Sequence, residues 1–242
     1  MPVYWFALSQ VTNISLKDAT LVFIILHLLV YPASNGYNSY MDRDTESVGG
    51  IKNPLQPSKQ LFYVSVLMDS LAIALSFIIS IYFAAGIIAY ILASRAYSYR
   101  GIRLKKYPIG GYLTVVFFQG AFTFFLVYHA CSADKTLHVP IAGMLTALLL
   151  IGGFYPLTQI YQHQQDKQDD VITLSILLGY KGTFIFTAII YAMAVAVLGY
   201  YLISSRQLTN FIMLQVFFIP VLIYFFWWFK KVMINTEAAN FK

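Results

Sequence analysis

The sequence predicts an all-α protein, a polytopic bundle of transmembrane helices. Of its 242 residues, 59% are hydrophobic and only 11% are charged, and the mean hydropathy is +0.68. Soluble domains are about half apolar and about a quarter charged. The aromatic content of 17% suits rings placed in lipid and at the membrane interface. These values exclude a soluble α/β enzyme.

Cysteine usage excludes two further classes. Cys131 is the only cysteine, so the chain forms no intrachain disulfide. The sequence has no Cys and His cluster at metal-ligand spacing, which rules out thiolate zinc sites and iron–sulfur centres.

Seven apolar stretches are candidates to cross a bilayer, which takes roughly 20 residues of helix. The third of these is short. We expect spans at 20–38, 61–82, 84–97, 109–130, 139–160, 182–204 and 208–229.

Residues 1–10 are apolar but too short to span, and they lack the basic start of a signal peptide. We therefore expect about seven full spans plus a partial first helix, in a chain that is short or truncated at both ends. No polar stretch is long enough for a separate soluble domain, so residues 1–242 are expected to form a single transmembrane domain.

The distribution of Lys and Arg predicts the topology. Lys17, Lys135 and Arg206 lie on one side of the predicted bundle, and the other thirteen basic residues lie on the opposite side. Because cytoplasmic loops are enriched in positive charge, we expect the loops at 39–60, 95–108 and 161–181 to be cytoplasmic. The predicted location is the inner (plasma) membrane of a bacterium.

Six of the ten acids fall in two short windows at the cytoplasmic ends of predicted helices. In each window, oxygen-bearing side chains recur every four residues, which places them on one helix face. The first set is Asn38, Asp42 and Glu46, and the second is Gln162, Asp166 and Asp170. Each central aspartate is followed at once by a base, so the two windows form a weak internal repeat.

Such oxygen-rich faces indicate a site for a divalent cation. Stacked carboxylates repel one another unless a cation lies between them, and Mg²⁺ prefers oxygen ligands while leaving positions for phosphate. A single acidic pair is more often a solvated turn, but two matching windows on one side of the membrane favour metal ions that bridge a diphosphate.

A basic loop lies between the two windows, with Arg100, Arg103, Lys105 and Lys106 on the same side of the membrane. Part of this charge anchors the topology. Arg and Lys are also the residues that bind phosphate groups. Nucleic acid is not an expected partner, because the patch is short and held at the bilayer.

Two polar residues lie inside predicted spans, Asp69 and Gln119. An ionisable group there costs about 2.5–3.5 kcal/mol on insertion scales, so it either has a function or is paired between helices. We count both, together with Asn35 and Gln162, as further candidate site residues.

Placed in order along the chain, these motifs resemble those of the UbiA family of intramembrane prenyltransferases. Asn38, Asp42 and Glu46 match three of the four defined positions in the Asn-Asp-x-x-Asp-x-x-x-Asp motif of the family, with Ser39 at the remaining one. The loop from Tyr97 to Lys105 is similar to the basic loop of the family.

The second acidic motif of the family is an aspartate pair followed by a Gly-x-x-Thr-Leu stretch. Asp166 and Thr173-Leu174 match it, while Gln162 stands in place of the earlier aspartate and Asp170 in place of the glycine. The resemblance covers essentially the whole chain, although the usual nine-helix pattern is incomplete at both ends.

This resemblance implies that the protein transfers an isoprenyl group from a prenyl diphosphate to an acceptor, usually an aromatic compound or quinone precursor, with Mg²⁺ as cofactor. Asp42 and Asp166 would be the catalytic carboxylates. The implied metal ligands are Asn38, Asp42, Glu46, Asp166 and Asp170, and the implied diphosphate-binding residues are Arg100, Arg103 and Lys105. The implied partners are the prenyl diphosphate, a lipophilic or aromatic acceptor and membrane lipids.

Two alternatives stay open. Acids beside helices also line ion paths, so a membrane transporter is one alternative, although the acids gather at one face and leave no relay across the bilayer beyond Asp69. The other is a catalytically impaired relative that binds prenyl lipids, which Ser39 and Gln162 make conceivable.

Overall fold

The computed structural model describes residues 2–43 and 55–239, except for the side chains at positions 164, 165 and 168. Seven helices within this part are long and apolar enough to cross a membrane, which confirms the predicted all-α transmembrane bundle. They run over Leu16–Asp42, Lys59–Ser76, Ile81–Ser98, Pro108–Cys131, Ile141–Gln162, Leu174–Ser204 and Leu208–Ile234.

Two of these spans contain a wider π-helical turn. The first consists of α2 (Leu16–Ile24), η1 (Ile25–Val30) and α3 (Tyr31–Asp42). The fourth consists of α6 (Pro108–Val116), η3 (Phe117–Phe122) and α7 (Thr123–Cys131). Directly after η3, the Thr123 hydroxyl donates to the Phe118 carbonyl at 2.7 Å, five residues back. Such turns rotate the side chains that follow and are frequent at functional sites.

The other spans are simpler helices joined by short segments. They are α4 (Lys59–Ser76), α5 (Ile81–Ser98), α8 (Ile141–Gln159) with η4 (Ile160–Gln162), α10 (Leu174–Ser204) and α11 (Leu208–Ile234). Shorter elements are α1 (Pro2–Gln10), η2 (Leu104–Lys106), α9 (His163–Gln168) and η5 (Thr236–Ala238). The predicted partial first helix is thus α1.

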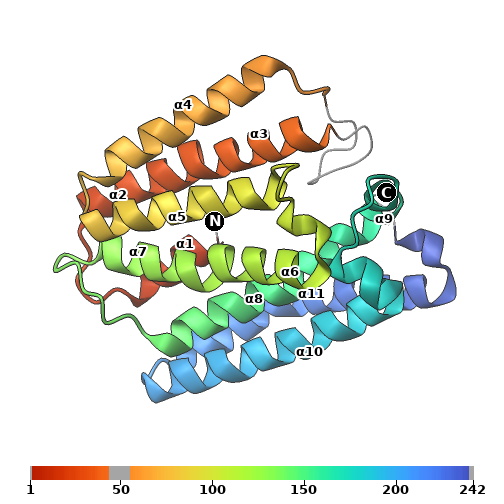
Figure 1. Ribbon diagram of the computed structural model, residues 1–242. Coiled ribbons are helices and arrows are strands. Elements are labelled where there is room, and N and C mark those ends of the chain that lie inside the picture. The colour runs from red at the N-terminus through yellow and green to blue at the C-terminus, as the bar shows by residue number, and fades with distance from the viewer. Residues whose placement is uncertain (1, 44–54, 240–242) are drawn as a thin grey trace.

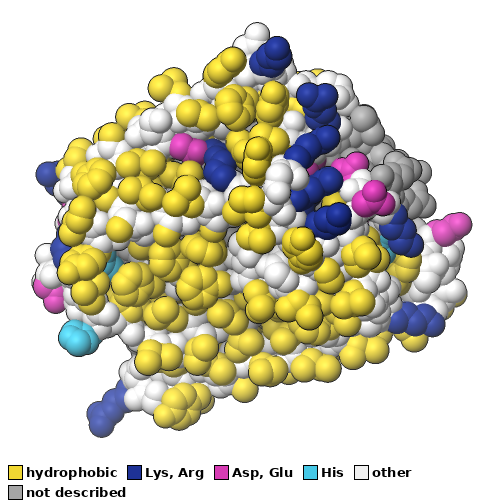
Figure 2. Space-filling view, viewed as in Figure 1, with side chains coloured by type: hydrophobic (Ala, Val, Ile, Leu, Met, Phe, Trp, Pro, Cys, Tyr) yellow, Lys and Arg dark blue, Asp and Glu magenta, His cyan; other side chains and the backbone are white. Residues whose placement is uncertain are grey.

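The helices lie side by side along one direction (Figure 1). The layer drawn at the top contains α2, α3, α4 and α5, and the layer below it contains α6, α7, α8, α10 and α11, with α1 packed against α7 and α8. Apolar side chains cover most of the visible face, while Lys and Arg gather at the end that carries η2 and α9 (Figure 2). This apolar belt is what a lipid-facing surface requires.

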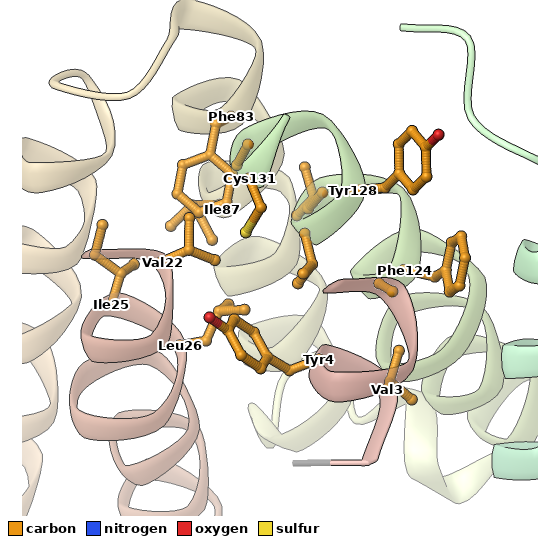
Figure 3. Packing of buried hydrophobic residues seen from close by; sticks show 14 of the residues in the cluster. Val3, Tyr4, Val22, Ile25, Leu26, Phe83, Ile87, Phe124, Tyr128 and Cys131 are labelled. Atoms are coloured by element: carbon orange, nitrogen blue, oxygen red, sulfur yellow. The ribbon is translucent and has the colours of Figure 1, made fainter. Parts of the chain in front are cut away.

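The main core fills the space between α1, α2, η1, α5 and α7 (Figure 3). Val22, Phe83 and Phe124 are completely buried there. The Tyr4 hydroxyl donates to the carbonyl of Ala19 at 2.7 Å and ties α1 to α2. A second, smaller cluster around Phe184 joins α10 to the end of α11. The rest of α11 exposes its apolar side chains, as expected for a helix that faces lipid.

Some predicted boundaries were wrong. The span expected at 182–204 begins earlier, at Leu174, because the Thr173 hydroxyl caps the new helix by accepting from the Ile176 amide. Gly179 then interrupts that helix with a φ of 66°, a left-handed conformation that glycine adopts at little cost. The third span is also longer than the predicted 84–97, at Ile81–Ser98.

Candidate active site at the charged end of the bundle

A cavity of about 240 Å³ lies among α3, α5, α6, η3 and α8, with η2 and α9 at its charged end. Both acidic windows and the basic loop contribute to its wall, so the structure brings together the three loops that the sequence analysis placed on one side. The predicted site residues that line it are Asn35, Asn38, Asp42, Lys105, Gln119, Gln162 and Asp166.

Asp42 and Lys105 form an ion pair at this charged end. The Lys105 Nζ lies 2.6 Å from the Asp42 Oδ1, and their side chains are only 11% and 3% exposed. Asp42 is the last residue of α3, because Arg43 adopts a left-handed conformation with a φ of 55° that ends the helix. A buried carboxylate needs such a counter-charge, since the penalty for burying it alone is large.

Asn38 lies one turn before Asp42 on the same face of α3. Its side-chain oxygen accepts a hydrogen bond of 2.7 Å from the Ser98 hydroxyl at the end of α5. This bond fixes the orientation of the amide toward the cavity. Glu46, the third member of the predicted set, lies outside the described residues.

The second acidic window is only partly helical. Gln162 and Asp166 line the cavity, from η4 and α9. Asp170 does not, because α9 ends at Gln168 and Asp170 takes a left-handed φ of 54°. The expectation that Asp170 shares a helix face with Asp166 was wrong, since the turn between them removes the four-residue periodicity.

His163, at the start of α9, contacts two residues of α10. Its Nε2 lies 2.8 Å from the Ser175 hydroxyl, which in turn lies 3.1 Å from the Thr183 hydroxyl beyond the Gly179 break. The imidazole stacks on the Tyr180 ring at a centroid distance of 4.6 Å. Burial, together with the charge of Lys167, lowers the pKa of His163 to about 4, so it is neutral at pH 7.

Only one of the three predicted phosphate-binding bases lines the cavity. The Arg100 Nε donates to the Met41 carbonyl at 2.8 Å and so holds the end of α3. Arg103 pairs with Asp169 at 3.0 Å, which links the basic loop to the second window. Arg100 and Arg103 therefore organise the charged end in this structure, and Lys105 is the base that reaches the cavity.

Asp69 also lies away from the cavity. Its carboxylate forms an ion pair with Arg95, whose guanidinium lies 4.0 Å from the centroid of the Tyr37 ring. The pair joins α4 and α5, and Arg95 also donates to the Ala33 carbonyl of α3 at 3.4 Å. Of the two explanations that the sequence allowed for this intramembrane acid, the structure supports pairing between helices.

Three of the cavity residues that sequence reasoning missed form a hydrogen-bonding wall. The hydroxyl groups of Tyr97 and Tyr155 are hydrogen-bonded to each other across the cavity wall. Gln159 lies one turn beyond Tyr155 and is buried. A polar Gln near the end of an apolar span is a signal that would have identified Gln159, whereas the tyrosines are common throughout this chain and give no such signal.

Local breaks in the hydrogen bonding of α8 shape this wall. Pro156 lacks an amide hydrogen and leaves the Gly152 carbonyl without its helical partner. The Tyr112 hydroxyl donates to that carbonyl at 3.2 Å, and the Thr187 hydroxyl donates to the Gly153 carbonyl at 2.9 Å. Side chains of neighbouring helices thus satisfy the polar groups that an apolar membrane cannot.

The chemistry of the charged end is that of an oxygen-rich, partly cationic pocket. Two carboxylates, Asp42 and Asp166, face it together with amide groups and one ammonium. No three His, Cys, Asp or Glu side chains in the described ranges form a ready metal site by themselves. Hard cations also accept amide oxygens, water and phosphate oxygens as ligands. The pocket therefore suits a divalent cation that arrives with an anionic phosphate ligand.

These features define a polytopic integral membrane protein with an oxygen-lined cavity at one end of its helices. A family model for the UbiA prenyltransferase family matches residues 1–241. The chain belongs to the UbiA prenyltransferase family. No curated protein sequence matches it at a significant level.

Solved structures of the same fold include a UbiA homologue from Archaeoglobus fulgidus bound to DMAPP and Mg²⁺, and the same homologue bound to GPP and Mg²⁺. Each superposes with a TM-score of 0.72 at 20% identity, covering 93% of this chain and 80% of the other. A structure of digeranylgeranylglyceryl phosphate synthase gives a TM-score of 0.60 at 20% identity, covering 98% of this chain and 83% of the other.

Proposed function

We propose that the protein is a Mg²⁺-assisted membrane prenyltransferase that moves an isoprenyl group from a prenyl diphosphate to an aromatic or quinone-precursor acceptor. The observation that carries the proposal is the convergence of Asp42, Asp166 and Lys105 on one cavity at the end of an apolar bundle. Family membership and the Mg²⁺ and prenyl diphosphate complexes of a homologue support it.

In this proposal Asn38, Asp42 and Asp166 would hold Mg²⁺, and Gln162 would be an additional oxygen ligand. The bound ion would supply charge stabilisation for the departing diphosphate. Lys105 lies at the same end of the cavity, and its positive charge would bind the diphosphate oxygens. Glu46 remains a proposed ligand outside the described residues, and Asp170 has no supporting contact with the cavity.

The cavity must also keep water away from the carbon atom that reacts. Breaking an allylic carbon–oxygen bond leaves positive charge on the prenyl group, which water would quench. Aromatic faces attract such charge, and Tyr90, Tyr97 and Phe118 line the cavity beyond the carboxylates. The Tyr97–Tyr155 hydrogen bond keeps that wall in one arrangement.

The test measures prenyl transfer by membranes that carry the full chain. The membranes are incubated with a lipid extract and with dimethylallyl or geranyl diphosphate radiolabelled in the prenyl group, and the products are identified by lipid mass spectrometry. We expect a labelled, chloroform-soluble product with Mg²⁺ and none with EDTA. Membranes carrying the Asp166→Asn variant at equal expression are the control. Label found only in unchanged substrate or in the free prenyl alcohol formed by hydrolysis would contradict a transferase.

A further inference from the structure

Two amide side chains mark the inner part of the cavity, away from the charged end. Asn35 lies seven residues before Asp42 on the same helix, about 10 Å deeper at 1.5 Å per residue. Gln119 lies in the π-helical turn η3 of the fourth span. Both side chains are exposed. No hydrogen bond joins either amide to another residue in the part of the chain that the structure describes.

These amides lie in membrane-spanning helices, where a polar group without a partner is costly. Structural amides in such helices bond to a neighbouring helix, as Asn38 does with Ser98. Asn35 and Gln119 instead present free donors and acceptors to the cavity. This arrangement indicates a ligand with its own hydrogen-bonding groups, and a prenyl chain has none.

The surrounding side chains add aromatic surface. The Tyr90 and Phe118 rings pack edge to face, with centroids 6.2 Å apart, and both line the cavity. The hydroxyls of Ser34 and Ser94 lie along the same wall. A site of apolar rings and a few convergent polar groups is typical for a small, flat organic molecule.

The inner part of the cavity carries no positive charge. Among the described lining residues the only cation is Lys105, which is paired with Asp42 at the charged end. Arg95 on α5 does not line the cavity, and its charge is matched by Asp69. A carboxylate placed beside Asn35 and Gln119 would give up part of its hydration without gaining a counter-ion, which is unfavourable.

We propose that Asn35 and Gln119 bind an uncharged aromatic acceptor, a phenol or quinol whose other polar group accepts and donates hydrogen bonds, and select against aromatic carboxylates. This inference rests on the proposed function, because it assigns the acceptor to the part of the cavity that the diphosphate leaves free. It narrows the acceptor from aromatic compounds in general to neutral ones.

The test uses the purified full chain in lipid nanodiscs with Mg²⁺ and geranyl thiolodiphosphate, an unreactive substrate analogue. Binding of the analogue is measured first, and its absence would contradict the proposed function rather than this inference. The analogue-loaded protein is then titrated with para-hydroxybenzamide and para-hydroxybenzoate, which share a ring and hydroxyl but differ in charge.

We expect the neutral amide to bind about tenfold more tightly than the carboxylate or better. Asn35→Leu and Gln119→Leu should each weaken binding of the amide about fivefold, the effect of one lost hydrogen bond. Gln119→Arg should reverse the preference by supplying the missing cation. Phe117→Leu is the control, because Phe117 lies two residues before Gln119 in η3, is exposed and does not line the cavity.

Three results would overturn the inference. The first is that the wild-type protein binds both phenols with equal affinity or prefers the carboxylate. The second is that protein which binds the analogue binds neither phenol. The third is that the control substitution weakens binding of the amide as much as Asn35→Leu and Gln119→Leu do.

Discussion

At the scale of single residues, the buried Asp42 carboxylate has Lys105 as its counter-charge, so removing the lysine tests how much the ion pair stabilises the protein. We expect Lys105→Met to lower the free energy of unfolding by about 3–5 kcal/mol, because it leaves a buried carboxylate uncompensated. Added Mg²⁺ should restore part of that loss if Asp42 is a metal ligand. Thermal unfolding of purified protein with and without Mg²⁺ measures both effects.

The neighbouring Lys106→Met is the control for this substitution, because Lys106 is exposed on the same short helix η2. Its melting temperature should stay within the scatter of wild type. Equal melting temperatures for the Lys105 and Lys106 variants would show that the ion pair contributes nothing measurable.

Gln162 is the position where this chain departs from the aspartate pair of its family. A glutamine carbonyl can ligate Mg²⁺ but brings no negative charge. Gln162 lines the same cavity as Asp166, so Gln162→Asp should lower the Mg²⁺ concentration needed for half-maximal prenyl transfer. A Mg²⁺ titration of both proteins at saturating prenyl diphosphate measures this. An unchanged or higher Mg²⁺ requirement in Gln162→Asp would contradict a role for Gln162 as a weak Mg²⁺ ligand.

Sequence patterns located the central residues of the site but not their partners. Asn38, Asp42 and Asp166 were predicted from a four-residue spacing, and all three line the cavity. The spacing failed at Asp170, where a left-handed backbone turn ends the helix. The ion pair of Arg103 with Asp169 could not be predicted from the sequence either, because it depends on the approach of two residues that are 66 positions apart.

At the scale of helices, the cavity depends on close approaches that only small residues allow. A Cβ on Gly120 would lie 2.7 Å from the Leu148 Cα and 2.9 Å from the Ala147 carbonyl oxygen, both backbone atoms of α8. Because backbone cannot move aside as a flexible side chain can, Gly120 sets the distance between η3 and α8. Small residues commonly permit such contacts between membrane helices.

We therefore expect Gly120→Ala to destabilise the protein by about 1–3 kcal/mol through overpacking. Gly110→Ala is the matched control in the same span, because a Cβ there meets only the Tyr107 Cβ at an ordinary 3.5 Å. The control should be neutral or slightly stabilising, as for glycine to alanine changes in helices generally. Unfolding in a mild denaturing detergent compares the two, and equal stability would contradict the role assigned to Gly120.

The helices themselves were predicted better than their ends. Apolar stretches of the required length identified all seven candidate spans. Their boundaries depended on local features that hydropathy does not register, such as the Thr173 cap and the Gly179 break before the sixth span. The π-helical turn at Phe117–Phe122 was also beyond sequence reasoning, although it carries Gln119.

At the scale of the whole molecule, the ends of the bundle differ in charge. The described residues of the three predicted cytoplasmic loops meet at the end that holds the cavity, whereas the ion pair of Lys135 with Asp18 lies at the loop that joins α7 to α8. The positive-inside rule then predicts that the cavity opens toward the cytoplasm, where a water-soluble diphosphate is available.

Single cysteines in a Cys131→Ser background test this orientation. A membrane-impermeant thiol reagent added to intact cells should label Arg206→Cys and spare Lys167→Cys, because the two exposed positions lie on opposite predicted sides. Permeabilised cells, in which both should react, are the control. Labelling of position 167 alone in intact cells would invert the topology.

The central claim is that the cavity formed by Asp42, Asp166 and Lys105 binds a prenyl diphosphate together with Mg²⁺. Calorimetric titration of the purified wild-type protein with geranyl diphosphate tests it most directly. We predict saturable binding at one site with Mg²⁺, loss of that binding with EDTA, and affinity about tenfold or more weaker for Asp166→Asn. Binding that is indifferent both to Mg²⁺ and to the loss of the Asp166 charge would contradict the claim.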